Sequence, residues 1–200
     1  MKMEALLGNV NKGFVVIVSA PAGTGKTTLV RMLIKEYPDV FIQSISCTTR
    51  LPRKGEVDGK DYVFIKEDIF QKRAARGEFI EYAKVFDHHY GTLKETVKLQ
   101  REAGKHVILV IDTQGALALK EKIEALFIFI KPPSLSALKE RLEKRETESE
   151  EARKKRLDFA ESELEQAKHY DYQIVNDDLD QAYTVLKSII IAEEHKVCNN

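Results

Sequence analysis

A short apolar run that leads into a glycine-rich loop with a Lys-Thr pair restricts the fold of this chain more than any other feature. Residues 14–18 read FVVIV, and residues 19–29 read SAPAGTGKTTL. An apolar run of this kind, without alternation, is typical of a strand buried on both faces of a parallel sheet. Glycines let backbone N–H groups point at an anion, and a helix that begins at Lys26 adds its own free N–H groups. The stretch therefore predicts a phosphate-binding loop between a strand and a helix.

The loop differs at one position from the GxxxxGK[ST] pattern of phosphate-binding loops, because Ala20 replaces the first glycine. We expect Lys26 to reach the β- and γ-phosphates of a nucleoside triphosphate and the Thr27 hydroxyl to hold Mg²⁺. An incidental glycine-rich turn is the alternative, and the flanking strand and helix patterns argue against it. The expected triphosphate-binding residues are Ala20, Pro21, Ala22, Gly23, Thr24, Gly25, Lys26, Thr27 and Thr28.

Two more apolar runs, at residues 107–112 and 125–130, repeat the pattern of a buried strand followed by a helical segment. This alternation predicts an α/β fold with a parallel sheet. Tyr172–Val175 is expected to be a short final strand. The expected helices run from Lys26 to near Tyr37, over 93–103, from Ser134 onward, and over 178–194.

The segment between these units breaks the rhythm, with turn residues at Pro52, Gly55 and Asp58-Gly59 and strand-like stretches YVFI and EFIEYAKVF. These features predict an inserted lobe of mixed β structure over residues 46–92. The core is then formed by residues 13–45 and 93–195, with a charged helical lid at about 139–160. We expect flexible termini at residues 1–12 and 196–200.

Charge and composition restrict the partners of the chain. Its 200 residues carry 32 Lys and Arg against 32 Asp and Glu, so a large basic surface for nucleic acid is not expected. No apolar run is long enough to span a bilayer, so no membrane insertion is expected. Two cysteines far apart in sequence indicate free thiols in a reducing, cytoplasmic compartment. The sequence favours neither a monomer nor a homo-oligomer.

The inserted lobe contains a second candidate anion site. Residues 44–62 read SISCTTRLPRKGEVDGKDY, with Arg50 and Arg53 separated by Pro52. Two guanidinium groups on a stiffened turn can grip a phosphate through paired hydrogen bonds. Solvated loop arginines are the alternative at this point.

The stretch TTRLPRKGEVDGKDY resembles the GMP-binding signature of guanylate kinases. EFIEYAKV, HYGT, VIDTQG, IFIKPPS, LKERLEKR and IVNDD follow in an order and at spacings similar to that family, from about residue 14 to 194. The resemblance implies a three-layer P-loop NTPase fold and a nucleoside monophosphate kinase. Such an enzyme transfers the γ-phosphoryl group of ATP to GMP with Mg²⁺, giving ADP and GDP.

The resemblance also implies residue roles. Glu81 is expected to accept hydrogen bonds from N1–H and N2–H of guanine, whereas adenine would present a lone pair at N1. The GMP-binding residues implied are Ser46, Arg50, Arg53, Tyr62, Glu81, Tyr90, Thr92 and Asp112, of which Asp112 also lies near the Mg²⁺ and phosphates. The catalytic residues implied are Lys26, Arg141, Arg145 and Arg156, and Asn176 is expected near the adenine of ATP.

The chain departs from the family pattern in the second half of the acceptor site. It reads LVIDTQG where the family commonly reads LDIDxQG, so Val110 replaces one carboxylate and Glu81 is expected to carry most of the guanine selection. Glu146 also follows Arg145 where the family usually has glycine. His88 and His89 are expected in an exposed loop.

Two alternatives stand beside GMP kinase activity. One is a non-catalytic guanylate-kinase-like module that binds proteins, and Lys26, Thr27 and the lid arginines argue against it. The other is a different small P-loop kinase, such as a ribose bisphosphate phosphokinase, and the full set of GMP-binding residues argues against it.

Overall fold

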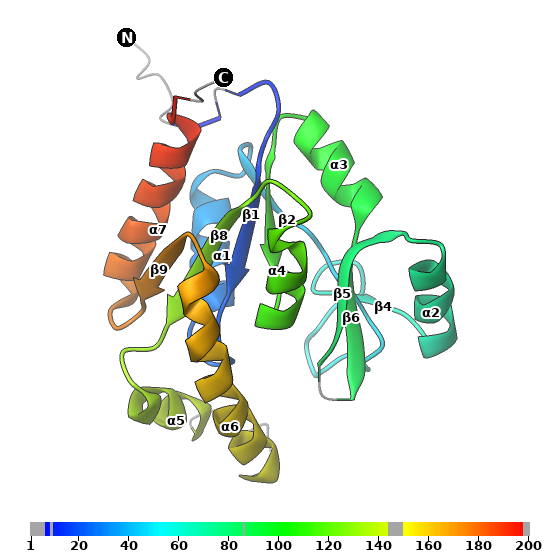
Figure 1. Cartoon of the computed structure of the whole chain (residues 1–200), viewed down its shortest axis with the longest axis vertical. Coiled ribbons are helices and arrows are strands. Elements are labelled where there is room, and N and C mark those ends of the chain that lie inside the picture. Colours follow the sequence, from blue (N-terminus) through cyan, green and yellow to red (C-terminus); the bar gives the residue numbers. More distant parts are fainter. Residues whose placement is uncertain (1–6, 9, 86, 144–149, 198–200) are drawn as a thin grey trace.

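A five-stranded parallel sheet forms the centre of the computed structural model, which describes residues 7–8, 10–85, 87–143 and 150–197, without the side chains of 150–156 (Figure 1). The middle strand pairs in register with both neighbours, so that Val16 lies between Ile108 and Leu126. In spatial order the strands are β2 (Phe41–Gln43), β7 (His106–Val110), β1 (Val15–Ser19), β8 (Leu126–Lys131) and β9 (Tyr172–Val175).

Helices cover both faces of this sheet, so the three-layer α/β fold expected from the sequence is confirmed (Figure 1). Val16 and Val18 pack on one face in a cluster that receives side chains from α1 (Lys26–Glu36) and α7 (Leu179–Glu194). Val15 and Ile17 pack on the other face, against α3 (Lys94–Glu102) and α4 (Thr113–Lys120). All five residues of β1 are buried, as expected for a strand covered on both faces.

A second, mixed sheet of four strands forms a lobe beside the core, on the right of Figure 1. Its order is β4 (Val63–Phe64), β3 (Cys47–Thr48), β6 (His88–Leu93) and β5 (Phe79–Val85). Helix α2 (Glu67–Ala75) packs against it through Phe70, whose ring stacks on Phe79 at 4.5 Å between centroids.

Two helices near the phosphate-binding loop occupy the segment expected to form the lid. Helix α5 (Leu135–Glu143) is capped by the Ser134 hydroxyl, which accepts a hydrogen bond from the Ala137 amide at 3.1 Å. Helix α6 (Glu150–Gln166) is followed by the 3₁₀ turn η1 (Ala167–His169). Leu138 and Leu142 of α5 form a small apolar cluster with Ala160 of α6 and with Ala22 of the loop.

The expectation of an exposed loop at His88 and His89 is wrong, because both residues belong to β6. The side chain of His89 is only 19% exposed, and its Nδ1 lies 2.9 Å from a carboxylate oxygen of Glu67. The ring also stacks on Phe70. The hairpin of β5 and β6 continues to the pair Val85 and His88, and this extension draws the histidines into the sheet.

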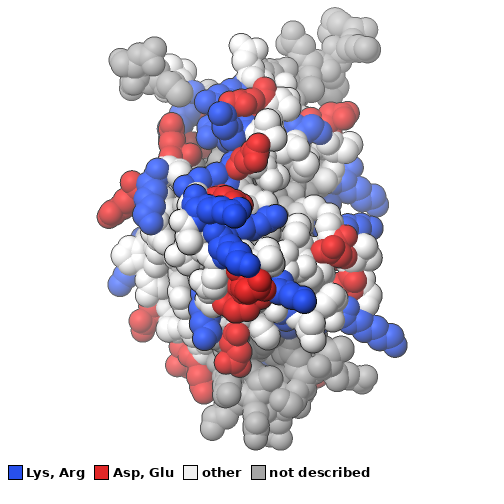
Figure 2. Space-filling model, turned by 90° about the vertical axis from the view of Figure 1, so that its right-hand side faces the viewer, with Lys and Arg blue, Asp and Glu red and all other residues white. Residues whose placement is uncertain are grey.

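Basic and acidic side chains are interspersed over the face of the molecule that Figure 2 shows. Within the described ranges, no helix combines the length and the apolar character needed to cross a bilayer.

Candidate nucleotide-binding site

A cavity of about 300 Å³ lies where the phosphate-binding loop, the end of β7, the mixed sheet and α6 meet. Most of the residues expected to bind nucleotides line it together, although they come from distant parts of the chain. These are the loop residues 20–28 and Ser46, Arg50, Arg53, Tyr62, Glu81, Tyr90 and Asp112.

The phosphate-binding loop takes its shape from two glycines in the left-handed region, Gly23 with φ 91° and Gly25 with φ 89°. Gly25 is the N-cap of α1, so the free N–H groups of the first helical turn adjoin the cavity. Lys26 donates from Nζ to the carbonyl of Ala20 at 3.0 Å. Ala20, which replaces the first glycine of the usual pattern, is buried, and its carbonyl accepts this hydrogen bond despite the replacement.

Asn176 supports the loop from behind. Its Nδ2 donates to the Thr24 carbonyl at 2.7 Å, and the Asn176 side chain is buried. A Cβ at position 25 would lie 2.4 Å from this Nδ2, so the contact requires glycine there. Asn176 itself does not number among the cavity-lining residues, and its expected contact with adenine stays a prediction.

An acidic residue that the sequence did not single out, Glu163 of α6, faces the loop lysine. Glu163 is 6% exposed, and burial raises its pKa to about 7, while the positive charge of Lys26 acts in the opposite direction. Burial lowers the pKa of Lys26, and the carboxylates of Glu163 and Asp112 counteract that shift. The part of the cavity beside the loop therefore holds a lysine whose charge is offset by nearby carboxylates.

The sequence contained a weak indication of this role for Glu163. Ala160, Glu163 and Ala167 recur at helical spacing, and all three are buried, whereas the dense charges of the segment favour a solvated helix. Val85, Val110, Ile111 and Phe159 also line the cavity, and of these only Val110 was singled out from the sequence.

A buried carboxylate of the mixed sheet lines the same cavity. Glu81 of β5 is 7% exposed and accepts a hydrogen bond from the Thr92 hydroxyl at 2.7 Å. Burial raises its pKa to about 7, and the nearby charge of Asp112 adds to the increase. The Ser46 hydroxyl lies 3.4 Å from that of Thr92. Gly115 of α4 allows the approach, because a Cβ there would lie 2.6 Å from Oε2 of Glu81.

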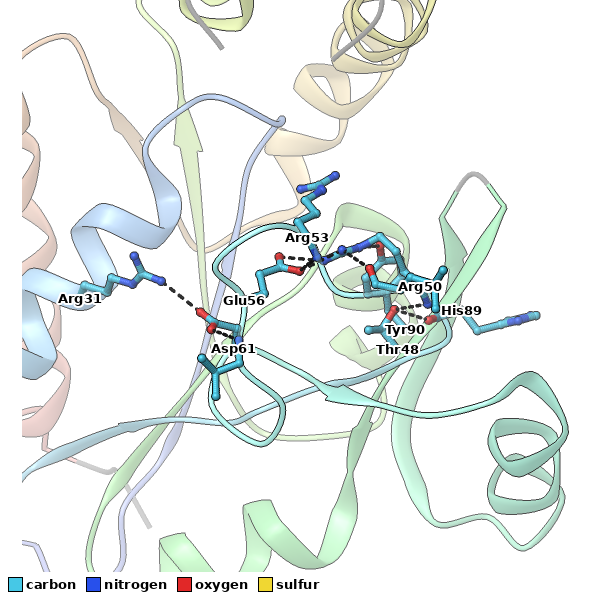
Figure 3. A network of polar contacts seen from close by, with 10 residues as sticks. Arg31, Thr48, Arg50, Arg53, Glu56, Asp61, His89 and Tyr90 are labelled. Carbon is cyan, nitrogen blue, oxygen red and sulfur yellow. Dashed lines mark hydrogen bonds and ion pairs between the residues drawn. The ribbon is translucent and has the colours of Figure 1, made fainter. Parts of the chain in front are cut away.

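Arg50, Tyr62 and Tyr90 also line this cavity, and Figure 3 shows Arg50 beside Tyr90. Arg50 donates from Nε to the Tyr90 hydroxyl at 3.3 Å, and its guanidinium lies 5.4 Å from the centre of the Tyr62 ring. Arg53 extends from the same loop, and Figure 3 shows its guanidinium directed away from Glu56. Burial raises the pKa of Tyr62, so its hydroxyl stays a neutral hydrogen-bond donor.

The expected lid arginines are not assembled at the cavity in the part of the chain that is described. Arg141 of α5 lies with its Nη2 3.5 Å from the carbonyl of Asp177 and does not line the cavity. Arg145 lies outside the described residues, and so does the side chain of Arg156. Thr92 contributes through its hydrogen bond to Glu81 without lining the cavity.

Comparisons with known proteins all find similarity to guanylate kinases over most of the chain. A family model described as Guanylate kinase matches residues 12–193. The guanylate kinase of Protochlamydia amoebophila is 60% identical, covering 95% of this chain and 96% of its own. That of Chlamydia trachomatis serovar D is 49% identical, covering 90% and 88%. The crystal structure of guanylate kinase from Anaplasma phagocytophilum superposes with a TM-score of 0.78 at 33% identity, covering 94% of this chain and 89% of that one.

Replacement of Asn176 by alanine is expected to weaken triphosphate binding about threefold to tenfold, because the loop loses one buried hydrogen bond. Calorimetric titration with MgATP measures the change. Gln173→Ala is the matched control, since Gln173 of β9 donates its amide to the Ala167 carbonyl, in a contact that the loop does not share. Equal affinities in the two variants would contradict a supporting role for Asn176.

Proposed function

The chain belongs to the guanylate kinase family and is an ATP:GMP phosphotransferase, and we propose that the cavity described above divides into an ATP end and a GMP end. Residues 13–45 and 93–195 form the core that holds ATP, with a lid at about 139–160, and residues 46–92 form the lobe that holds GMP. One observation carries this division: the phosphate-binding loop and the acceptor residues Glu81, Arg50 and Tyr90 face the same cavity.

At the ATP end, the residues position and neutralise rather than form covalent bonds with the phosphoryl group. The amides of Gly23 and Gly25 and of the first turn of α1 surround the phosphates, and Lys26 supplies a positive charge. Its side chain already has a fixed direction through the Ala20 carbonyl. When the triphosphate arrives, the phosphate charge takes over the stabilisation of Lys26 that Glu163 and Asp112 give in its absence.

At the GMP end, base recognition and phosphate recognition are spatially separate. Glu81, held by Thr92, accepts from the N1–H and N2–H groups of guanine. Arg50, Arg53, Tyr62 and Tyr90 donate to the GMP phosphate and direct it toward the γ-phosphoryl group. Fixed placement of both substrates supplies most of the catalysis that a phosphoryl transfer needs.

The residues present fit a magnesium ion. Thr27 offers a hydroxyl at the cavity, and Asp112 offers a carboxylate, both hard oxygen ligands of the kind that Mg²⁺ prefers. When bound, the ion neutralises charge on the phosphates. Asp112 is held in place as the N-cap of α4, where its Oδ1 accepts from the Gly115 amide at 2.9 Å.

The lid arginines Arg141, Arg145 and Arg156 complete the catalytic set by neutralising charge on the transferred group. The packing of Leu138 and Leu142 of α5 near the phosphate-binding loop supports this placement, since it holds the base of the lid against the ATP end. Cys47 is a free buried thiol, which supports a reducing compartment, and the cytoplasm is the proposed location.

The acceptor is tested by ADP release from MgATP, measured with GMP, AMP, CMP, UMP and no acceptor. We expect ADP with GMP at a rate more than about 10³-fold above that with AMP, because adenine leaves Glu81 without its two donors. A Lys26→Ala variant serves as the control for contaminating kinases. ADP release at the same rate without an acceptor would identify an ATPase and contradict the proposal.

Replacement of Val110 by aspartate is expected to lower KM for GMP about tenfold and to increase discrimination against AMP. Val110 lines the cavity with Glu81, so a carboxylate there can accept a further hydrogen bond from guanine. Val110→Asn has a similar shape without the charge and is the control. Unchanged GMP affinity and discrimination in Val110→Asp would show that position 110 takes no part in base selection.

The pH dependence of kcat/KM for GMP reports the ionisation of Glu81. Its pKa is raised to about 7, so the carboxyl is protonated below that pH and loses its capacity to accept both guanine N–H groups. We expect kcat/KM to be constant above about 7 and to fall up to about tenfold for each pH unit below it, and more steeply below about 6, where the phosphate of GMP also gains a proton.

Two other groups titrate nearby and are separated by controls. Glu163 adjoins the ATP end, so its ionisation affects kcat/KM for MgATP measured at saturating GMP. The phosphate of GMP titrates near about 6 in every variant. Glu81→Gln is therefore expected to retain only the phosphate limb, and an unaltered profile in that variant would rule out Glu81 as the titrating group.

A further inference from the structure

Arg50 is bound on one whole edge by a carboxylate of its own loop, that of Glu56 (Figure 3). Nη2 of Arg50 donates to Oε1 of Glu56 at 2.9 Å, and Nη1 donates to Oε2 at 3.0 Å. The side chains are only 10% and 20% exposed. Paired guanidinium–carboxylate bonds with this geometry are among the strongest polar contacts in proteins.

The other donors of Arg50 are also directed by the protein. Nε donates to the Tyr90 hydroxyl, and the second Nη1 hydrogen is donated to the Leu51 carbonyl at 2.7 Å. A guanidinium has five N–H groups, so partners among the described residues account for four and leave one on Nη2. The Tyr90 oxygen accepts from Arg50, which leaves its own O–H to be donated elsewhere.

Glu56 is itself fixed by its loop. Its Oε2 accepts a hydrogen bond from the Arg53 amide at 2.7 Å, and its own amide donates to the Arg53 carbonyl at 3.0 Å. Hydrogen bonds from Arg50 lower the pKa of Glu56, which keeps the carboxylate ionised. If a phosphate displaced Glu56, it would accept from the two Arg50 donors only what the carboxylate already accepts, and the Arg53 amide would lose its acceptor.

We propose that Glu56 is a positioning residue of the acceptor-phosphate site, which stays bound to Arg50 during the reaction and fixes its guanidinium. This inference rests on the proposed function. Glu56 holds Arg50 so that one Nη2 hydrogen and the hydroxyl of Tyr90 are presented to the GMP phosphate in a fixed arrangement. Glu56 also offsets the charge of Arg50. This part of the site therefore recognises the phosphate through the orientation of its hydrogen-bond donors more than through net positive charge.

The alternative, in which Glu56 leaves Arg50 when GMP binds, predicts the opposite effect on the affinity for GMP. If Glu56 merely occupied the place of the phosphate and left when GMP bound, it would compete with GMP, and its neutralisation would tighten GMP binding. If Glu56 positions Arg50, neutralisation loosens the guanidinium and weakens GMP binding.

The test is steady-state kinetics of Glu56→Gln with both substrates. We expect KM for GMP to rise about tenfold, the typical effect of removing one charge-assisted pair, with kcat lowered less than about threefold. KM for MgATP and the inhibition constant of guanosine against GMP are expected to stay within about twofold, since neither ligand has a phosphate in this part of the cavity.

Glu78→Gln is the matched control, since Glu78 belongs to the same lobe and pairs with Arg73 at 3.8 Å and with Arg76 at 3.7 Å. A fall in KM for GMP in Glu56→Gln, or the same KM as in Glu78→Gln, would overturn the proposal. A parallel weakening of guanosine inhibition would also overturn it, because that result indicates general damage to the lobe.

A double variant tests whether Glu56 acts through Arg50. In an Arg50→Lys background, Glu56→Gln is expected to change KM for GMP by less than about twofold, because the shared fork geometry is already lost. A full tenfold effect in that background would contradict the inference. If Glu56→Gln fails to fold, Glu56→Asp, which keeps the charge but shortens the reach to Arg50, is expected to give the same rise in KM. Phosphorylation of GMP by the unaltered chain tests the proposed function separately.

Discussion

The position of the phosphate-binding loop depends on the burial of β1 on both faces. A strand covered by two layers of helices has no freedom to shift by one residue, because every side chain would move to the opposite face. The loop that leaves its carboxyl end is therefore placed by the packing of the whole core. Asn176, which follows β9, then fixes the loop through the Thr24 carbonyl. The backbone amides of the phosphate-binding loop are rigid because strands distant in sequence end side by side at this edge of the sheet.

Acidic side chains are buried along the cavity, and burial of an ionised carboxylate is costly. Glu81 and Glu163 have pKa values of about 7, and Asp112 lies near both. In the proposed complex this balance changes, because guanine would supply hydrogens to Glu81 and phosphate charge would engage Lys26. The two perturbed carboxyl groups line one cavity, in agreement with the tendency of such groups to mark functional positions.

Local sequence patterns predict the parts of the site that are continuous in the chain. The strand, loop and first helix follow from FVVIVSAPAGTGKTTL, because burial and phosphate binding impose short-range rules. Glu163 is only weakly indicated, by its helical spacing from Ala160 and Ala167, because a buried acid in a highly charged helix resembles a solvated one until its packing partners are known. The hydrogen bond from Asn176 to the Thr24 carbonyl joins residues that lie 152 positions apart in the sequence. The pair of Arg50 and Glu56 crosses an irregular loop, where no helical or strand periodicity relates the two residues.

The hydrogen bonds that link the hydroxyls of Ser46 and Thr92 to the carboxylate of Glu81 all run in one direction. This direction decides which groups the cavity presents to a ligand. With Glu81 ionised, the one hydrogen of Thr92 is committed to the carboxylate. The contact between Ser46 and Thr92 then requires the Ser46 hydrogen to point at Thr92. Ser46 is left with lone pairs alone toward the cavity. Glu81 and Ser46 consequently present only acceptors to the cavity, and a ligand edge made of donors is their complement.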